Sequence, residues 1–463
     1  MGSAGTLRLC GKRDPTGQGI DRRLNVRQTR LVEITFSSGR SGAGPATWGQ
    51  AAKWDVIRNL GTDAARYNVS GGTPITPGLP FAHIASIVSH LVLRHESLRT
   101  RLCETETGSR QQFEGSGAIP VTVRRCEPAD VTENAHALYF ELQGQPFELA
   151  SLPTRIGLIE ASELIHYIIF SLSHTASDGW GLRNLLADCT TLLGGGAPDG
   201  GLVQPLEEAS FQVSERGRRR DAAARRYWRD KLQTAPASQF PSRAGQPPAE
   251  KFPNAVLNSP ALSLATEFVA AQLEVSPSAV LLAAASSFTE ARDAVFQVVI
   301  NNRFLPGMAT GVNVIAQEGL FCLSGTDSDF ATLVRRAFGA SLSAHRHAYY
   351  DKLALDRDLA AMTCTGDSSC IVNDLRGLMP IRGFAKPTAL PLRQARDLTT
   401  LTWPTEFPPR ANVTFALDAQ DAPGSMELAM TADSALLPRP DMERFLYGIE
   451  DLVITQALAL GSN

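Results

Sequence analysis

The stretch SLSHTASDGWG, residues 171–181, places a histidine and an aspartate four residues apart, between an apolar strand pattern and a helical pattern. Histidine is the side chain that most readily accepts a proton near neutral pH. His174, at the end of a strand, could therefore act as a general base. The same residues also allow a structural interpretation, in which Asp178 caps the next helix, Gly179 relieves the turn and His174 is a satisfied polar residue.

Other arrangements that could do chemistry are weaker. Ser173 and His174 do not form a hydrolase dyad, because successive side chains of a strand point to opposite faces, and the sequence has no GxSxG motif. The seven cysteines are scattered singly without a CxxC, which predicts neither a zinc ribbon nor a disulfide framework. His345 and His347 have no acidic or cysteine partner at metal-binding spacing, so we expect no metal site.

Composition limits the class of protein. The 463 residues are 43% hydrophobic and 20% charged, with a formal net charge of −3, which is ordinary for a globular protein and does not favour nucleic-acid binding. No run of 18 uncharged apolar residues predicts a membrane span, and residues 1–14 lack the apolar centre of a signal peptide. We expect a cytoplasmic monomer.

The elements that must position His174 alternate between helix and strand along two halves. We predict a flexible N-terminal segment at 1–28, an N-terminal half at 29–200, a connecting helix and linker at 201–255, and a C-terminal half at 256–463. Each half has the size of a domain. The alternation predicts two similar α/β domains.

Three helical patterns carry specific expectations. TWGQAAKWDVIRNLG predicts a helix that stops at Gly61, and residues 329–353 read as one helix. The basic stretch 214–236 reads as a helix with a solvated face and with Tyr227 and Trp228 packed inward. A patch for an acidic partner is the alternative interpretation of its arginines.

Several segments together indicate a family. The SHTASDG motif corresponds to HHxxxDG, LVLRHESLRTRL to RHxxLRTxF, PFELASLPTRIGLI to PFDLxxxPLxRxxL, and RRYWRDKL to YWxxxL. The helix TWGQAAKW, with Gln50, and the segments SPSAVLLAAASSF and INNR extend the match. The chain thus resembles the condensation domains of nonribosomal peptide synthetases, within the superfamily built like chloramphenicol acetyltransferase. The likeness covers most of residues 30–455.

The resemblance implies a mixed α/β (α+β) fold of two chloramphenicol acetyltransferase-like halves, which form a V-shaped pseudo-dimer with a central tunnel. It implies that His174 lies beside an attacking amine, and that Asp178 has a structural role opposite an arginine of the other half. Arg303 of INNRF is the first candidate partner and Arg99 the second. Ser173 departs from the family, because it replaces the first histidine of the motif.

The function that the resemblance implies is a stand-alone condensation enzyme of natural-product biosynthesis. An amine or hydroxyl would attack an acyl or aminoacyl thioester on a carrier protein and form an amide or ester. The chain would need no cofactor of its own, since a partner carrier protein supplies the phosphopantetheine arm. Two alternatives stay open: a non-catalytic domain that recruits partner proteins, and a coenzyme A-dependent acyltransferase.

Overall fold

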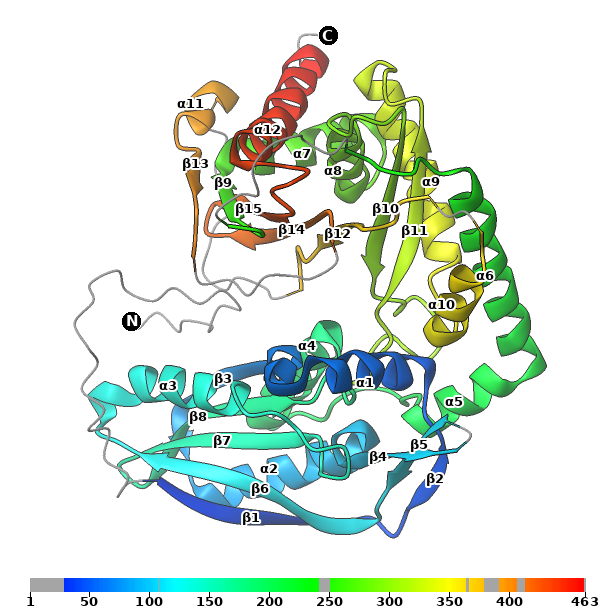
Figure 1. Ribbon diagram of the computed structural model, residues 1–463. Helices are drawn as coiled ribbons and strands as arrows, with labels where there is room; N and C mark the ends of the chain where they lie inside the picture. The colour runs from blue at the N-terminus through cyan, green and yellow to red at the C-terminus, as the bar shows by residue number, and fades with distance from the viewer. Residues whose placement is uncertain are drawn as a thin grey trace. The chain divides into compact units, whose positions relative to one another are not determined.

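The computed structural model describes residues 29–106, 108–240, 250–363, 366–378, 391–405 and 413–461. The described chain forms two compact units (Figure 1). Unit 1 contains the described residues up to Arg218 together with Asn301–Ala316 and Asp351–Leu353, and unit 2 contains the rest. The predicted flexible segment 1–28 lies outside the described residues.

Unit 1 is a five-stranded sheet in the order β1-β6-β7-β8-β3 with a smaller sheet β2-β5-β4. Its elements are β1 (Thr29–Ser37), β2 (Gly42–Pro45), α1 (Trp48–Leu60), the 3₁₀ helix η2 (Gly61–Tyr67), β3 (Val69–Leu79), α2 (Phe81–Arg94), η3 (Glu96–Arg99), β4 (Thr100–Thr105), β5 (Gly108–Phe113), β6 (Ser116–Arg125), η4 (Pro128–Asp130), α3 (Val131–Gln143), β7 (Thr154–Ala161), β8 (Leu164–Leu172), α4 (Gly179–Leu193) and α5 (Pro205–Val213). In the large sheet β6 and β7 are parallel and the other neighbours antiparallel.

Helices cover both faces of the large sheet in unit 1. Leu91 of α2 and Leu185 of α4 belong to one apolar cluster with Ile168 of β8, and Leu138 of α3 belongs to another with Ile169. Because neighbouring residues of a strand face opposite sides, a strand covered on both faces is apolar at nearly every position. This explains the continuous apolar run that leads into the motif.

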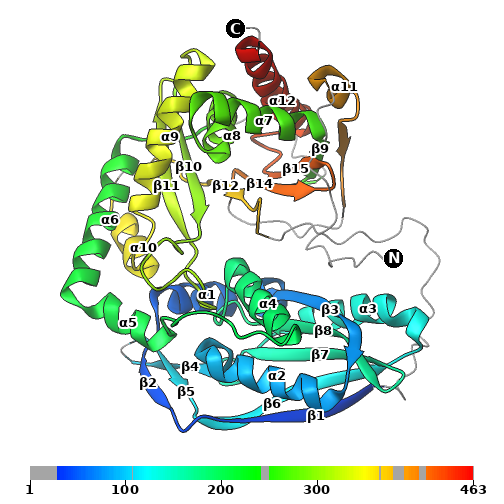
Figure 2. The same cartoon turned by 180° about the vertical axis from the view of Figure 1, so that it is seen from behind.

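Unit 2 is built on a seven-stranded sheet in the order β11-β10-β12-β14-β15-β9-β13. Its elements are α6 (Glu215–Thr234, whose first turn lies in unit 1), β9 (Asn254–Ser259), α7 (Pro260–Leu273), α8 (Pro277–Ser286), β10 (Asp293–Ile300), β11 (Gln317–Ser324), α9 (Phe330–Arg346), α10 (Lys352–Ala360), β12 (Cys370–Asp374), α11 (Leu392–Arg396), β13 (Thr400–Thr402), β14 (Phe415–Ala422), β15 (Ser425–Ala432) and α12 (Arg439–Gly461). The turned view shows α7, α8 and α12 together over one face of this sheet (Figure 2).

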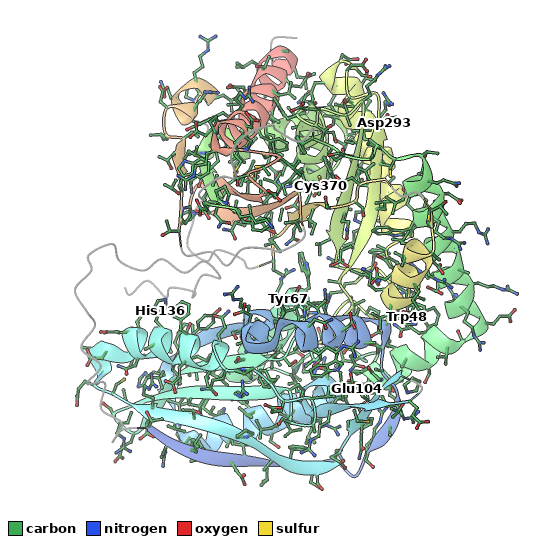
Figure 3. The ribbon with its side chains drawn as sticks, viewed as in Figure 1. Trp48, Tyr67, Glu104, His136, Asp293 and Cys370 are labelled. Carbon is green, nitrogen blue, oxygen red and sulfur yellow. The ribbon has the colours of Figure 1, made fainter. Side chains whose placement is uncertain are left out.

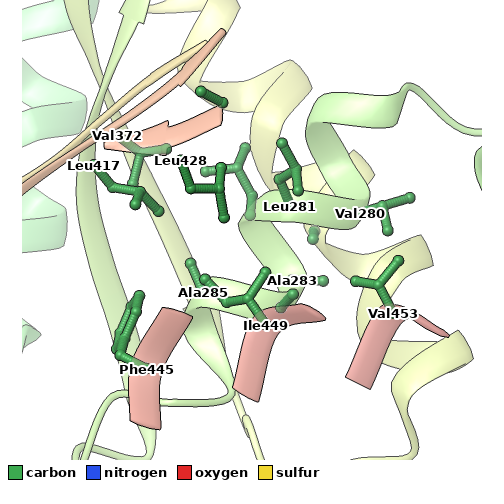
Figure 4. Packing of buried hydrophobic residues seen from close by; sticks show 14 of the residues in the cluster. Val280, Leu281, Ala283, Ala285, Val372, Leu417, Leu428, Phe445, Ile449 and Val453 are labelled. Atoms are coloured by element: carbon green, nitrogen blue, oxygen red, sulfur yellow. The ribbon is translucent and has the colours of Figure 1, made fainter. Parts of the chain in front are cut away.

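Figure 4 shows part of the core of unit 2, in which Phe445, Ile449 and Val453 of α12 share an apolar cluster with Leu417 and Leu428 of the sheet. A second cluster joins Trp228 of α6 to β10, β11 and α10. Trp228 is 2% exposed, as the sequence predicts, and Tyr227 is half-buried.

Some expectations differ from the structure. The segment 329–353 is two helices, because α9 ends at Arg346 and α10 begins at Lys352. The predicted connector 201–255 contains α5 and α6, which cluster mainly with unit 1 and unit 2 respectively. Residues 301–316, placed by sequence in the C-terminal half, make their contacts in unit 1.

No single helix among the described residues is long and apolar enough to cross a membrane. The pair α7 and α8, bent by 106°, meets the length and composition criteria together.

Candidate functional site

His174 lies in the turn that joins β8 to α4. Its Nδ1 is 3.0 Å from the carbonyl oxygen of Ser177. A carbonyl oxygen can only accept a hydrogen bond, so Nδ1 carries the proton. Nε2 of the neutral ring therefore bears a lone pair, and no hydrogen-bond partner occupies it among the described residues. The turn thus presents an imidazole that can accept a proton.

The surroundings of His174 disfavour its protonated form. Burial and the charge of Lys53 lower the pKa of His174 to about 4, against the opposing effect of Asp178. The ring centroid of Tyr67, at the end of η2, is 5.8 Å from that of His174, with the planes tilted by 40°. Tyr67 is labelled in Figure 3. His174 keeps part of its surface open to solvent. The ring is therefore neutral near pH 7.

Asp178 connects the turn to helix α4 and to the loop that contains Ile315 and Ala316. It is the N-cap of α4, since its Oδ1 accepts a 2.7 Å hydrogen bond from the Gly181 amide. Its Oδ2 accepts 2.9 Å and 2.8 Å hydrogen bonds from the amides of Ile315 and Ala316. Burial alone would raise the pKa of Asp178, but Arg303 and the amides of Ala316 and Gly181 lower it below its usual value. The carboxylate is thus charged and 2% exposed.

Arg303 makes the ion pair with Asp178 that the sequence predicts. Its Nη2 is 2.9 Å from Oδ1 and its Nη1 is 3.1 Å from Oδ2 of Asp178, a bidentate contact. Nη2 also donates to the carbonyls of Gly311 and Asn313. Because residues 301–316 belong to unit 1, the pair lies within one unit and not between two halves.

The second candidate partner, Arg99, is placed elsewhere. Its guanidinium lies 5.0 Å from the ring centroid of Phe113 and 3.6 Å from Glu96. Its remaining donors go to backbone carbonyls, including that of Val92. Arg99 is a buried structural residue.

Ser173, the residue that departs from the family motif, is buried and engaged locally. Its Oγ lies 2.9 Å from Oγ1 of Thr175 and accepts a 3.3 Å hydrogen bond from the Thr175 amide. This hydrogen bond spans His174 and resembles the local turns that serine commonly makes. Ser173 and Thr175 line a small cavity together with Trp54, Leu102 and several residues of the segment before β7, which are Phe147, Glu148, Leu149, Ser151 and Pro153.

Two glycines belong to the site although the sequence did not single them out. A Cβ on Gly181 would lie 2.4 Å from the Ser177 Oγ, and a Cβ on Gly49 of α1 would lie 2.1 Å from the Val314 carbonyl oxygen. At both positions the neighbouring oxygen atom can lie this close to the backbone only because glycine has no side chain. The signal available in the sequence was a glycine inside a helical pattern. The motif glycine, Gly179, is the first residue of α4 and does not have positive φ.

The two histidines near the end of α9 make local contacts. His345 and His347 lie near carbonyls of their own helix, and His347 stacks on Tyr227 at 4.2 Å. Among the described residues there is no group of three histidine, cysteine or acidic side chains that could hold a metal ion.

The condensation domain family model matches residues 50–372, more than half of the chain. This chain therefore belongs to the condensation domain family.

Known proteins agree with that assignment. Tyrocidine synthase 2 from Brevibacillus parabrevis is 29% identical over 138 residues, which cover 30% of this chain and 4% of that protein. A polyketide synthase-nonribosomal peptide synthetase from Aspergillus clavatus is 26% identical over 219 residues, which cover 46% of this chain and 5% of that protein. The chain spans about a twentieth of the length of the first curated relatives it matches.

The solved structures share the fold. The condensation domain from the Monacolin K polyketide synthase MokA has a TM-score of 0.66 at 16% identity, covering 90% of this chain and 98% of that one. The complex of the X-domain and OxyB from teicoplanin biosynthesis contains a chain with a TM-score of 0.63 at 16% identity, covering 91% and 95%. The predicted fold, mixed α/β with two chloramphenicol acetyltransferase-like lobes, is confirmed.

Condensation domains of nonribosomal peptide and polyketide synthases are acyltransferase-like domains. Their chemistry is the formation of amide or ester bonds, and they act together with carrier-protein domains.

Proposed function

We propose that this chain transfers an acyl or aminoacyl group from a carrier-protein thioester to an amine or a hydroxyl, with His174 as the residue that receives the proton of the nucleophile. The phosphopantetheine arm of the carrier is part of the substrate. The observation that carries the proposal is the hydrogen bond from Nδ1 of His174 to the Ser177 carbonyl, which leaves Nε2 free to accept a proton.

The low pKa of His174 limits how the ring can assist the transfer. A ring with a pKa of about 4 is a weak base, but it is unprotonated at neutral pH and cannot repel an incoming amine by charge. Such a ring orients the nucleophile through a hydrogen bond and takes its proton as the tetrahedral intermediate forms. A positioned group of this kind contributes about 10²–10⁴ in rate.

Asp178 and Arg303 act on the reaction through the position of His174. They join the first turn of α4 to residues 311–316, so the turn cannot move independently of that loop. Neither carries the proton of the nucleophile in this proposal.

The test is a transfer assay with a chemically loaded carrier protein. Carrier loaded with an acyl or aminoacyl group is incubated with candidate amines and alcohols, and the product is followed by intact-protein mass spectrometry. A parallel arm replaces the carrier with acyl-coenzyme A. Product from the carrier arm alone supports the proposal, whereas turnover from coenzyme A alone supports the acyltransferase alternative.

A non-catalytic recruitment role is the second candidate. Ser173 in place of the first motif histidine favours it, and so does the fold likeness to a chain from the complex of an X-domain with OxyB. If this role is correct, the protein binds a loaded carrier or a partner enzyme in a pull-down but forms no product. The His174→Ala variant then binds as well as the wild type does.

A further inference from the structure

Helix α1 lies against the loop that holds Asp178. Gly49 approaches the Val314 carbonyl so closely that a Cβ would be 2.1 Å from its oxygen. The next two residues, Ile315 and Ala316, donate their amides to Asp178. The first turn of α1 is thus fixed next to the turn that carries His174.

Lys53 lies on the side of α1 that faces this turn. Residues four apart are neighbours on one helix face, so Lys53 falls between Gly49, which contacts the loop, and Ile57, which is 7% exposed. The side chain of Lys53 is half-buried. Two more residues of the same stretch flank the motif: Trp54 shares a cavity with Ser173, and the Tyr67 ring contacts His174.

Two charged side chains, those of Lys53 and Asp178, influence the protonation of His174. Lys53 comes from α1, and Asp178, paired with Arg303, comes from the turn itself. The Asp178 charge is compensated by Arg303 and by backbone amides. Lys53 is the positive charge that opposes protonation of the His174 ring.

We propose that Lys53 is a catalytic residue of this site, whose ammonium group stabilises the negative charge that develops on the thioester carbonyl oxygen beside His174. This proposal rests on the proposed acyl transfer and deepens it. The nucleophile forms a bond to the carbonyl carbon, and the carbonyl π pair moves onto the oxygen. Return of that pair expels the pantetheine thiolate, which takes up the proton received by His174.

The charge on the oxygen exists only in the tetrahedral intermediate and the transition states around it. A cation placed there acts on kcat more than on KM, and a single donor to an oxyanion is worth about 10²–10³ in kcat. A lysine that bound a carboxylate of the acceptor would instead change the KM for that acceptor.

The variants for the test are Lys53→Met, which removes the charge and keeps the chain length, and Lys53→Arg, which keeps the charge. Arg58→Met, on the exposed side of the same helix, is the matched control. Steady-state transfer is measured with loaded carrier at varied acceptor concentration. We expect Lys53→Met to lower kcat about 10²-fold with little change in KM, Lys53→Arg to recover much of the rate, and Arg58→Met to match wild type.

A second measurement, NMR titration of the His174 ring, does not depend on turnover. Removing a nearby cation should move its midpoint upward in Lys53→Met and leave it unchanged in Arg58→Met. An unchanged midpoint, an unchanged kcat, or a raised acceptor KM at normal kcat overturns the role of Lys53. Wild-type protein that makes no product overturns the proposed function itself, and the catalytic role of Lys53 with it.

Discussion

Two properties of His174 cannot be predicted from a sequence pattern. They are the ring nitrogen that carries the proton in the neutral form, and the extent to which the surroundings disfavour the protonated ring. The spacing of the motif predicts a histidine at a strand end. The choice of tautomer depends on the Ser177 carbonyl three residues later, and the charge state depends on Lys53, which is 121 positions away in the chain (174 − 53). Neither dependence has a local sequence signal.

The protonation of His174 can be measured directly. NMR of the eight histidines, with His174→Gln used to assign the resonance, should give a midpoint near 4. The folded-state pKa is below the ordinary value of 6.5, so the ring stays neutral at every pH above about 5 and gains its proton only as the pH falls through 4. A midpoint near 6.5 would show that the ring is solvated and that Lys53 is not close.

Ser173 has a structural role within the turn. Its hydroxyl pairs with both the amide and the hydroxyl of Thr175, and both residues are buried. Ser173→Ala should therefore reduce the free energy of unfolding by about 1 kcal/mol. Urea denaturation of Ser173→Ala, Thr175→Val and the double variant measures this effect. Additive losses would contradict the shared hydrogen bond.

Asp178 and Arg303 connect two elements, the start of α4 and the loop 311–316. Removing one member of a buried ion pair leaves the other without compensation and costs about 3–5 kcal/mol. Asp178→Ala and Arg303→Ala should each lower stability and activity together, and the double variant should be less destabilised than the sum. Strict additivity, or a stable but inactive Asp178→Ala, would contradict the structural role of this pair.

Gly49 determines how close α1 lies to the loop. The atom that a Cβ would meet is a backbone oxygen, which cannot rotate away. Gly49→Ala should force α1 outward, lower the free energy of unfolding by about 1–3 kcal/mol and slow the transfer. Gly339→Ala in α9, where nothing lies within 4 Å, is the control and should be neutral or stabilising by up to about 1 kcal/mol. Equal behaviour of the two variants would contradict the close contact.

Elements with a clear period were predictable, and those with an irregular composition were not. The helix ending at Gly61 follows directly from its capping residues and its helical period. Strand β3, VSGGTPITPGL, was missed, because its glycines and prolines argue against a strand. It lies at the edge of its sheet, where a missing amide costs little.

At the scale of the whole chain, the division into two α/β units was predictable and its boundaries were not. Two separate sheets with separate cores follow from the alternation of elements in each half. The return of 301–316 to unit 1 has little compositional signal, because several of its contacts use backbone groups that any residue carries. The amides of Ile315 and Ala316 donate to Asp178, and the carbonyl of Val312 accepts from Ser97. The pairing of Asp178 with Arg303 was predicted only through the family resemblance.

The central claim is that this chain is an active acyl transferase whose turnover needs His174. The most direct measurement compares wild type and His174→Ala in single-turnover transfer from a loaded carrier protein, with circular dichroism and thermal unfolding as the control for folding. We predict that the variant folds normally and transfers about 10²-fold more slowly or worse. A folded His174→Ala protein that transfers at the wild-type rate would contradict this claim.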